Sequence, residues 1–473
     1  MASTRRDFLR QTGCAIIGGA ALVSSIEEFG LINAFAQGNS ATTDYKALVC
    51  IFMSGGNDGN NTIVPVDATR YAEYSNARSA AGLALAAPGQ AGGLLPVNPI
   101  SGGAYGLHPA MPELKALFDN RQLAVVTNVG PLVEPLTRDT YRNGSGKKPF
   151  QLFSHSDQVA QWQTSVSSDA SQTGWGGRTA DRAAALNGAA TFPQVVSIAG
   201  TTLFATGLNT RPLGISDSRT ALASVLPLNN APTAAGYTTA QTNARRAAFD
   251  SLRNLDLGAT LVKASRDTTE QAIQTSVALS ATNSTLVTEF PNTTLGYQLE
   301  QVARLIKLRD TLGIKRQIFF CSLGGFDTHS GQGTATGAQA NLLIQVSQAM
   351  RAFYDATVEL NIQNNVTAFT LSDFGRTLQP AGSGGAVGSD HGWGNHGFIM
   401  GGAVRGGDFY GRFPTLALGG PDDTDTRGRW IPSTSVEQYA ATLASWYGLS
   451  ASDIPLVFPF INRFPTANLG FMS

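Results

Sequence analysis

Residues 47–58 read Ala47-Leu48-Val49-Cys50-Ile51-Phe52-Met53-Ser54-Gly55-Gly56-Asn57-Asp58, an uninterrupted apolar run followed at once by a polar, glycine-rich turn. A run without polar alternation is typical of a strand that is buried on both faces. Short apolar runs that end in turns return at residues 123–127, 194–198, 317–323, 366–371 and 398–400. The sequence therefore predicts several buried strands, with polar residues where the strands end.

Segments with the period of an amphipathic helix lie between these runs. Apolar residues recur every three or four positions in two of them, at Leu295, Leu299, Val302 and Ile306 and at Leu342, Val346, Met350 and Phe353. Strands that alternate with helices predict an α/β fold with a mostly parallel central sheet flanked by helices. Ligands bind such sheets at the carboxyl ends of strands, so the polar residues there are candidates for a functional site.

The middle of the chain differs in composition from the rest. Residues 200–292 are rich in Ala, Thr, Ser, Gly and Asn, and helical pieces are predicted at 244–257 and 265–279. We expect this region to be a peripheral helical or loop-rich insertion in a single domain over residues 37–473. A separate domain is the alternative.

The first 36 residues have the features of a twin-arginine signal peptide. The motif is Thr4-Arg5-Arg6-Asp7-Phe8-Leu9-Arg10, a weakly apolar stretch follows up to Val23, and Ala34-Phe35-Ala36 offers a cleavage site. We therefore expect the twin-arginine machinery to export the folded protein to the periplasm or beyond. An amphipathic first helix with a chance arginine pair is the alternative. No later apolar run is long enough to predict a membrane span in the mature chain.

The balance of charge indicates which kinds of binding partner to expect, and the cysteine positions indicate whether a disulfide forms. The chain has 33 Lys+Arg and 33 Asp+Glu, without a basic run of the kind that binds nucleic acid. A small molecule or another protein is therefore the expected partner. Cys50 and Cys321 each lie in an apolar run, where cysteine usually is a small buried hydrophobe, although an exported protein would allow them to pair.

Carboxylates and imidazoles gather after the predicted strands. These residues are Asp58, Asp327, His329, Asp373, Asp390, His391 and His396. Since the strand ends should converge on one edge of the sheet, the like charges there would require a cation. Carboxylate and imidazole suit a divalent ion, with Zn, Mn or Ca as candidates. Turn formation, helix capping and hydrogen bonds to carbonyl groups are the alternative roles.

Three further residues are candidates for catalysis. Ser154 and Ser156 precede a helical run, so either hydroxyl would be a nucleophile at a helix N-terminus whose amides hold an anionic substrate; a helix cap is the alternative. Arg376 follows Asp373 closely and would hold a pair of phosphate or sulfate oxygens, unless it is a surface residue paired with a loop carboxylate. His155, between the serines, is either a supporting group or a structural histidine.

The ordered motifs resemble a known family. They are the twin-arginine leader, Gly55-Gly56-Asn57-Asp58, Leu107-His108-Pro109, Ser154-His155-Ser156, Gly324-Gly325-Phe326-Asp327-Thr328-His329, Ser372-Asp373-Phe374-Gly375-Arg376-Thr377 and Asp390-His391-Gly392. This set is similar to the exported bacterial family called domain of unknown function 1501. That family resembles the alkaline phosphatase and sulfatase superfamily in fold.

The resemblance implies roles for individual residues. Asp58 resembles the superfamily's first carboxylate, Ser154 or Ser156 its nucleophile, Asp327 and His329 a late ligand pair, and His391 or His396 its last histidine. Phe374 departs from the usual Asp-His-Gly pattern and cannot bind a metal, which leaves a single-metal site, a rearranged site or an inactive scaffold.

The implied function is that of an exported, metal-dependent hydrolase of phosphate or sulfate esters. A non-catalytic exported binding or assembly protein on a phosphatase-like scaffold is the alternative.

Overall fold

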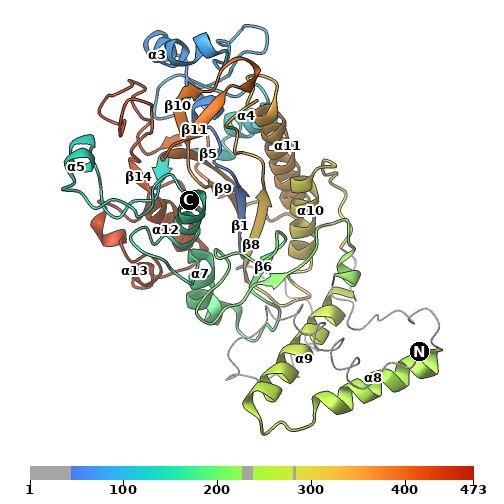
Figure 1. The fold of residues 1–473 in the computed structure, drawn as a ribbon. Helices are drawn as coiled ribbons and strands as arrows, with labels where there is room; N and C mark the ends of the chain where they lie inside the picture. Colours follow the sequence, from blue (N-terminus) through green and yellow to red (C-terminus); the bar gives the residue numbers. More distant parts are fainter. Residues whose placement is uncertain (1–43, 226–237, 281–283) are drawn as a thin grey trace, which may run out of the picture.

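A nine-stranded sheet with helices on both faces forms the centre of the molecule (Figure 1). The computed structural model describes residues 44–225, 238–280 and 284–473, so the predicted signal peptide lies outside the described residues. The strands of the sheet are β1 (Lys46–Met53), β5 (Leu123–Gly130), β6 (Val195–Ser197), β7 (Leu213–Gly214), β8 (Arg316–Leu323), β9 (Val366–Ser372), β12 (Asn395–Met400), β13 (Phe409–Tyr410) and β14 (Thr434–Ser435).

Smaller strands and the helices surround this sheet. The remaining strands are β2 (Ile63–Pro65), β3 (Leu95–Val97) and β4 (Tyr105–Leu107) in one small sheet, and β10 (Arg376–Ala381) and β11 (Gly388–His391) in another. The helices are α2 (Gly59–Thr62), α3 (Ala68–Arg78), α4 (Pro112–Asp119), α5 (Arg138–Asn143), α6 (His155–Thr164), α7 (Trp175–Ala183), α8 (Thr239–Arg253), α9 (Thr260–Ser280), α10 (Thr294–Lys307), α11 (Ala338–Glu359), α12 (Val436–Tyr447) and α13 (Ile454–Val457). Short 3-10 turns occur at Ser79–Ala81, Ala184–Asn187, Leu222–Ser224, Gly384–Ala386 and Ile461–Arg463.

The sheet is mostly parallel, which confirms the predicted fold class. Its order is β13-β5-β12-β9-β1-β8-β6-β7, with β14 beside β5, and each of the six apolar runs seen in the sequence forms one of its strands. Only β12 runs antiparallel to its neighbours, β5 and β9. The start of β12 therefore lies at the edge where β1, β8 and β9 end, and this brings the residues just before β12 to that edge.

Each strand buries side chains on both faces, as the uninterrupted apolar runs require. In β1, Val49 and Ile51 join a core with α10 and α11, whereas Leu48 and Cys50 join a second core with α7 and α12. Cys321 belongs to the first core, so the sheet separates it from Cys50. Both cysteines are buried and free.

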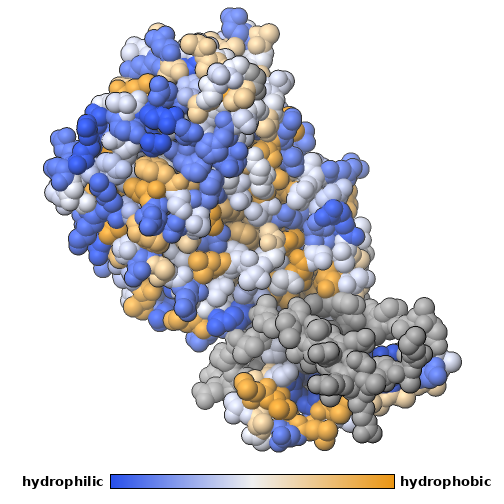
Figure 2. Space-filling model, in the orientation of Figure 1, coloured by the Kyte–Doolittle hydropathy of each residue, from blue (hydrophilic) through white to orange (hydrophobic). Residues whose placement is uncertain are grey.

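The middle region contributes an edge strand and two projecting helices. Strand β7 pairs with β6 at the edge of the sheet, while α8 and α9 extend away from the end of the molecule that carries β10 and β11 (Figure 1). Figure 2 shows apolar residues gathered at the surface over this projection, and Leu252, Leu255 and Leu261 are exposed there. Within the described part of the chain, no helix combines the length and apolar character needed to cross a membrane.

A buried acid in α12 predicts a pH-dependent term in stability. Burial raises the pKa of Glu437 to about 8, although the Phe460 N–H and the charges of Arg178 and Arg463 act in the opposite direction. The folded protein therefore holds a proton that the unfolded chain releases above about pH 4.3, so this contribution to stability is full below that pH and is lost as the pH rises toward 8. We expect the stability of the wild type relative to Glu437→Gln to fall by roughly 2–4 kcal/mol between pH 5 and pH 8.

Urea unfolding at several pH values measures this difference. Glu359→Gln, which changes an exposed carboxylate at the end of α11, is the matched control and should leave the trend in place. If the stability of Glu437→Gln changed with pH as that of the wild type does, Glu437 would carry its charge in the folded protein.

Candidate metal centre

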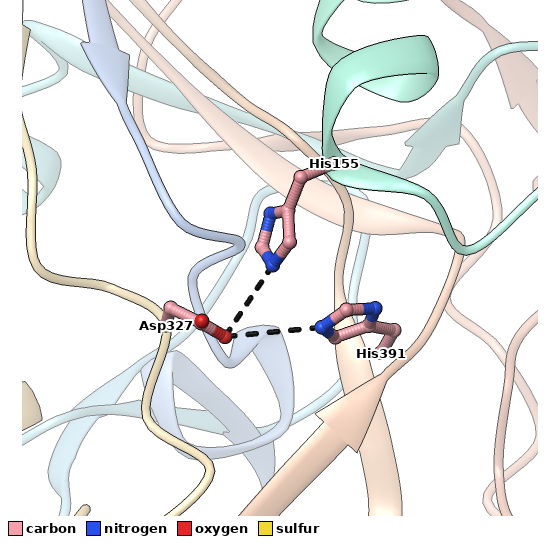
Figure 3. A group of neighbouring side chains, drawn as sticks. All are labelled: His155, Asp327 and His391. Carbon is pink, nitrogen blue, oxygen red and sulfur yellow. Dashed lines mark ion pairs between the residues drawn. The ribbon is translucent and has the colours of Figure 1, made fainter.

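The carboxyl edge of the sheet brings an aspartate and three histidines together. Asp327 and His329 follow β8, His391 ends β11 shortly before β12, and His155 is the first residue of α6. Figure 3 shows His155, Asp327 and His391 pointing toward one another, and one ligand atom from each lies within 4.8 Å of the other two. We call His155, Asp327, His329 and His391 the His/Asp cluster.

The turn after β1 allows these loops to approach closely. Gly55 has φ +116, and a side chain at this position would collide with the backbone N of Asp327. Only glycine adopts such a conformation without strain and leaves room for the neighbouring chain. Gly55 therefore allows the turn after β1 to pack against the loop after β8.

The polar tips of the cluster lie at coordination distances from one another. The Oδ1 atom of Asp327 is 3.2 Å from His329 Nε2, 3.4 Å from His155 Nε2 and 3.8 Å from His391 Nε2. The Nε2 atoms of His329 and His391 are 2.8 Å apart. In a tetrahedral zinc site with bonds of about 2.0–2.1 Å, neighbouring ligand atoms are about 3.3–3.4 Å apart. The distances of 3.2–3.8 Å from Asp327 Oδ1 bracket this value, whereas the 2.8 Å between the two Nε2 atoms is shorter, so His329 and His391 would move apart slightly around such an ion.

The other nitrogen of each ring is held by an acceptor. His155 Nδ1 lies 2.8 Å from Asp373 Oδ2, His329 Nδ1 lies 3.2 Å from Asp390 Oδ1, and His391 Nδ1 lies 2.7 Å from the Phe153 carbonyl oxygen. Because each Nδ1–H is donated to an acceptor, the Nε2 lone pairs face into the cluster. The buried Nε2 of His155 has no hydrogen-bond partner. A cation in the cluster would satisfy these converging lone pairs.

The charges around the cluster favour an ionised carboxylate and neutral imidazole. Burial alone would raise the pKa of Asp327, but its hydrogen bond to Arg376 and the nearby His329 and His155 outweigh burial and lower the pKa. Burial is the main cause that lowers the pKa of His391, and the neighbouring His155, Arg376 and His329 lower it further, while the Phe153 carbonyl acts against them. Both groups are thus held in the form that binds a metal.

Arg376 lies beneath the cluster rather than beside a substrate. Its guanidinium is buried, and it donates to Asp327 Oδ1 and to the carbonyl groups of Gly55, Gly56 and Ser389. A side chain with 0% exposure cannot meet a ligand that arrives from solvent. Arg376 therefore orients Asp327 and links the loop after β1 to the loop after β8.

Phe374 forms the apolar wall behind two of the histidines. Its ring centroid is 4.7 Å from that of His155 and 4.6 Å from that of His391, and the side chain is fully buried. Phe374 therefore packs against both rings and restricts their orientation.

Two of the ligands expected from the sequence lie outside the cluster. Asp58 is buried in an ion pair with Arg78 of α3, at 2.5 Å from Nη1, and its carboxylate also accepts from Gln332 Nε2 at 2.6 Å. An arginine rather than a metal thus balances the Asp58 charge. His396 is buried in β12, where it stacks on Phe413 and accepts from the Asn128 N–H at 3.2 Å. Burial lowers the pKa of His396 to about 3, so it is a neutral, structural side chain.

Two others support the cluster from behind. Asp373 is almost fully buried and accepts from the Gly55 N–H at 2.9 Å while it orients His155. Asp390 orients His329 and pairs with Arg427 at 2.6 Å. Supporting carboxylates of this kind fix the ring and raise the basicity of a metal-binding histidine.

Ser154 and Ser156 lie at the start of α6, as expected. Ser154 Oγ is 2.5 Å from Asp157 Oδ2, Ser156 Oγ is 3.2 Å from the same oxygen, and the two hydroxyls are 3.1 Å apart. Neither caps the helix through its side chain. Ser154 stands between Phe153, whose carbonyl holds His391, and His155, so its backbone borders the cluster.

The sequence did not predict His155 as a ligand. Its neighbours are serines at the start of a helix, which is also the composition of an ordinary helix N-terminus. The available signal was its position at the start of α6 together with Asp373, its acceptor. That pairing joins residues 218 positions apart.

The fold and the cluster define a class of protein: an α/β protein with a candidate metal centre at the carboxyl edge of a mostly parallel sheet. Residues 45–424 match the family described as "Protein of unknown function (DUF1501)". The match spans more than half of the chain, so this protein belongs to that family, which confirms the resemblance seen in the motifs. Among curated proteins, none matches.

Two solved structures are similar to the chain at 10% identity. One is the PsFucS1 sulfatase from Pseudoalteromonas sp., with a TM-score of 0.28 over 79% of this chain and 65% of the sulfatase chain. The other is Ps i-CgsB in complex with k-i-k-neocarrahexaose, with a TM-score of 0.32 over 89% of this chain and 77% of that chain. The first match thus spans just under two thirds of the sulfatase's length. At these scores neither structure bears on activity, and the fold class rests on the sheet itself.

Proposed function

We propose that this protein is an exported metal-dependent hydrolase of phosphate or sulfate esters. The observation that carries the proposal is the convergence of three imidazole Nε2 atoms and Asp327 Oδ1, while every Nδ1 is held by an acceptor. His155, Asp327 and His391 would hold the ion, with His329 beside them. The imidazole-rich set favours zinc over calcium, which prefers six to eight oxygen ligands. When bound, the ion would act as a Lewis acid on an ester oxygen.

The chain's own groups support hydrolysis at this place. The side chains of the cluster are between 24% and 48% exposed, so a substrate has access to them from solvent. We assign the nucleophile to Ser154 or Ser156, because the Asp157 carboxylate accepts from both hydroxyls and orients them. Arg376 was expected to contact the substrate. We now assign it the role of holding Asp327 in place.

The export route and partners form part of the proposal. The Arg5-Arg6 motif supports passage through the twin-arginine machinery, and the balanced charge supports a small anionic substrate rather than nucleic acid.

The metal content of the purified protein tests the proposal. We expect about one equivalent of a zinc-class ion by elemental analysis, and hydrolysis of 4-nitrophenyl phosphate or 4-nitrophenyl sulfate. Asp327→Ala/His391→Ala should lose both the ion and turnover, because two converging ligands are removed. Asp119→Ala, which changes an exposed carboxylate paired with Lys115, is the control and should keep both.

Two outcomes would count against hydrolysis. A wild-type protein that takes up neither zinc nor manganese would rule out the metal centre. Metal binding without turnover of either ester class would instead favour the binding or assembly protein, in which Phe374 and the cluster maintain a scaffold.

A further inference from the structure

The segment between β13 and β14 forms one rim of the His/Asp cluster. Asp423 organises this segment, because its buried carboxylate accepts from the backbone N–H groups of Gly419, Asp425, Gly428 and Arg429 at 2.8–3.1 Å. Four charge-assisted bonds to one buried carboxylate fix the backbone. The side chains that leave this segment toward the cluster therefore start from a rigid base.

Two arginines of this segment reach the cluster. Arg429 donates from Nε to the His391 carbonyl at 2.8 Å and from Nη1 to Asp425 at 2.6 Å, and its guanidinium stacks over Phe153. Arg427 donates from Nη2 to Asp390 Oδ2 at 2.6 Å. Because the other oxygen of Asp390 holds His329, Arg427 and His329 are neighbours across a single carboxylate.

Arg427 differs from Arg376 and Arg429 in how many of its guanidinium nitrogens lack a hydrogen-bond partner. Arg376 is fully buried, and Arg429 uses both Nε and Nη1 in hydrogen bonds. The Arg427 side chain is 32% exposed, and among the described residues its Nε and Nη1 have no hydrogen-bond partner. Its backbone is nevertheless fixed, since its N–H donates to the Asp425 side chain and its carbonyl accepts from the Gln379 N–H. Arg427 is thus a positioned cation with free donors facing solvent.

We propose that Arg427 binds the substrate's oxyanion, which makes the substrate a phosphate or sulfate monoester with its charged oxygens exposed to the guanidinium. This inference rests on the proposed function of the same site. The carboxylates of Asp327, Asp373 and Asp390 would repel an anion that enters the cluster, and a guanidinium at the rim offsets that repulsion. Nη1 and the second N–H of Nη2 lie side by side at the end of the Arg427 guanidinium, so together they match two oxygens of a tetrahedral group.

Anion binding to the zinc-loaded protein tests the inference. Calorimetry with inorganic phosphate and with inorganic sulfate should show that Arg427→Gln binds both about 10- to 100-fold more weakly than the wild type, with unchanged zinc content. Arg412→Gln is the matched control, because Arg412 lies in the same segment and forms a two-bond pair with Asp422 at 2.7 Å. It should bind both anions as the wild type does. The anion that the wild type binds more tightly indicates the ester class.

A conservative variant separates anion binding from support of Asp390. Arg427→Lys keeps the charge but loses the paired donors, so we expect full zinc content and intermediate anion affinity. Wild-type affinity in Arg427→Gln would overturn the inference, and so would loss of zinc in Arg427→Gln that is restored in Arg427→Lys, since Arg427 would then act only through Asp390 and His329. A wild-type protein that binds no zinc would instead refute the proposed function on which the inference rests.

Discussion

Arg78→Met is expected to lower the free energy of unfolding by about 3–5 kcal/mol, because it leaves the Asp58 carboxylate buried without its counter-charge. Both side chains are 0% exposed, and Arg78 also donates to the carbonyl groups of Thr377 and Leu378. The substitution therefore removes a charge pair and two links between α3 and β10. Urea unfolding monitored by circular dichroism measures the loss.

A double variant distinguishes this pair from a metal ligand. Asp58→Asn/Arg78→Met removes both charges and should recover part of the stability that Arg78→Met loses, since no uncompensated charge remains. Arg351→Met breaks an exposed pair with Asp355 and should cost less than about 1 kcal/mol. If Arg78→Met were as stable as the wild type, another positive charge would balance Asp58. Asp58 would then again be a candidate metal ligand.

His155→Ala is expected to weaken metal binding by more than about 100-fold, because it removes an imidazole whose Nε2 faces the cluster, a larger change than loss of a supporting group. The measurement is competition for zinc with a chromogenic chelator, which does not depend on any enzymatic activity. The alanine would also remove the His155 Nδ1 contact of Asp373, 2.8 Å in the wild type, and leave the Gly55 N–H as its hydrogen-bond donor.

The neighbouring serine provides the control for His155. Ser156→Ala changes an exposed side chain on the next residue of α6 and should bind zinc as the wild type does. Asp373→Asn should fall between them, with affinity reduced about 10- to 100-fold, since the amide oxygen still accepts from His155 but carries no charge. Wild-type zinc affinity in His155→Ala would show that His155 lies outside the coordination sphere.

The sequence predicted those parts of the candidate site that depend only on the residue type and on its position after a strand. Asp327, His329 and His391 meet because β8 and β12 bring their loops to one edge, which the alternation of strands and helices already indicated. The sequence also predicted Asp373 and Asp390 at this edge, as metal ligands. In the structure they instead accept from the Nδ1 atoms of His155 and His329, and this role depends on how the histidine rings are oriented. Sequence spacing carries no information on ring orientation.

The same limit explains Asp58, His396 and Arg376. Each occupies a strand end or its neighbourhood, yet each is buried against a partner that is far away in the sequence: Arg78 for Asp58, Phe413 for His396 and the Gly55 carbonyl for Arg376. Arg78 is a helical residue without any sequence feature that links it to Asp58. Burial and pairing of these groups follow from packing between elements.

The sequence by itself determined the fold class, because uninterrupted apolar runs form strands only where both faces are covered and because helical periods alternate with them. It also predicted that Asp327, His329 and His391 lie near the carboxyl edge, but it did not place His155 there. Only the tertiary structure decided which of these groups face one another, since α6 brings His155 into the cluster and α3 brings Arg78 to Asp58. The physical reason is that a buried charge takes whichever opposite charge or dipole packing brings within hydrogen-bond distance, and local sequence does not specify that neighbour.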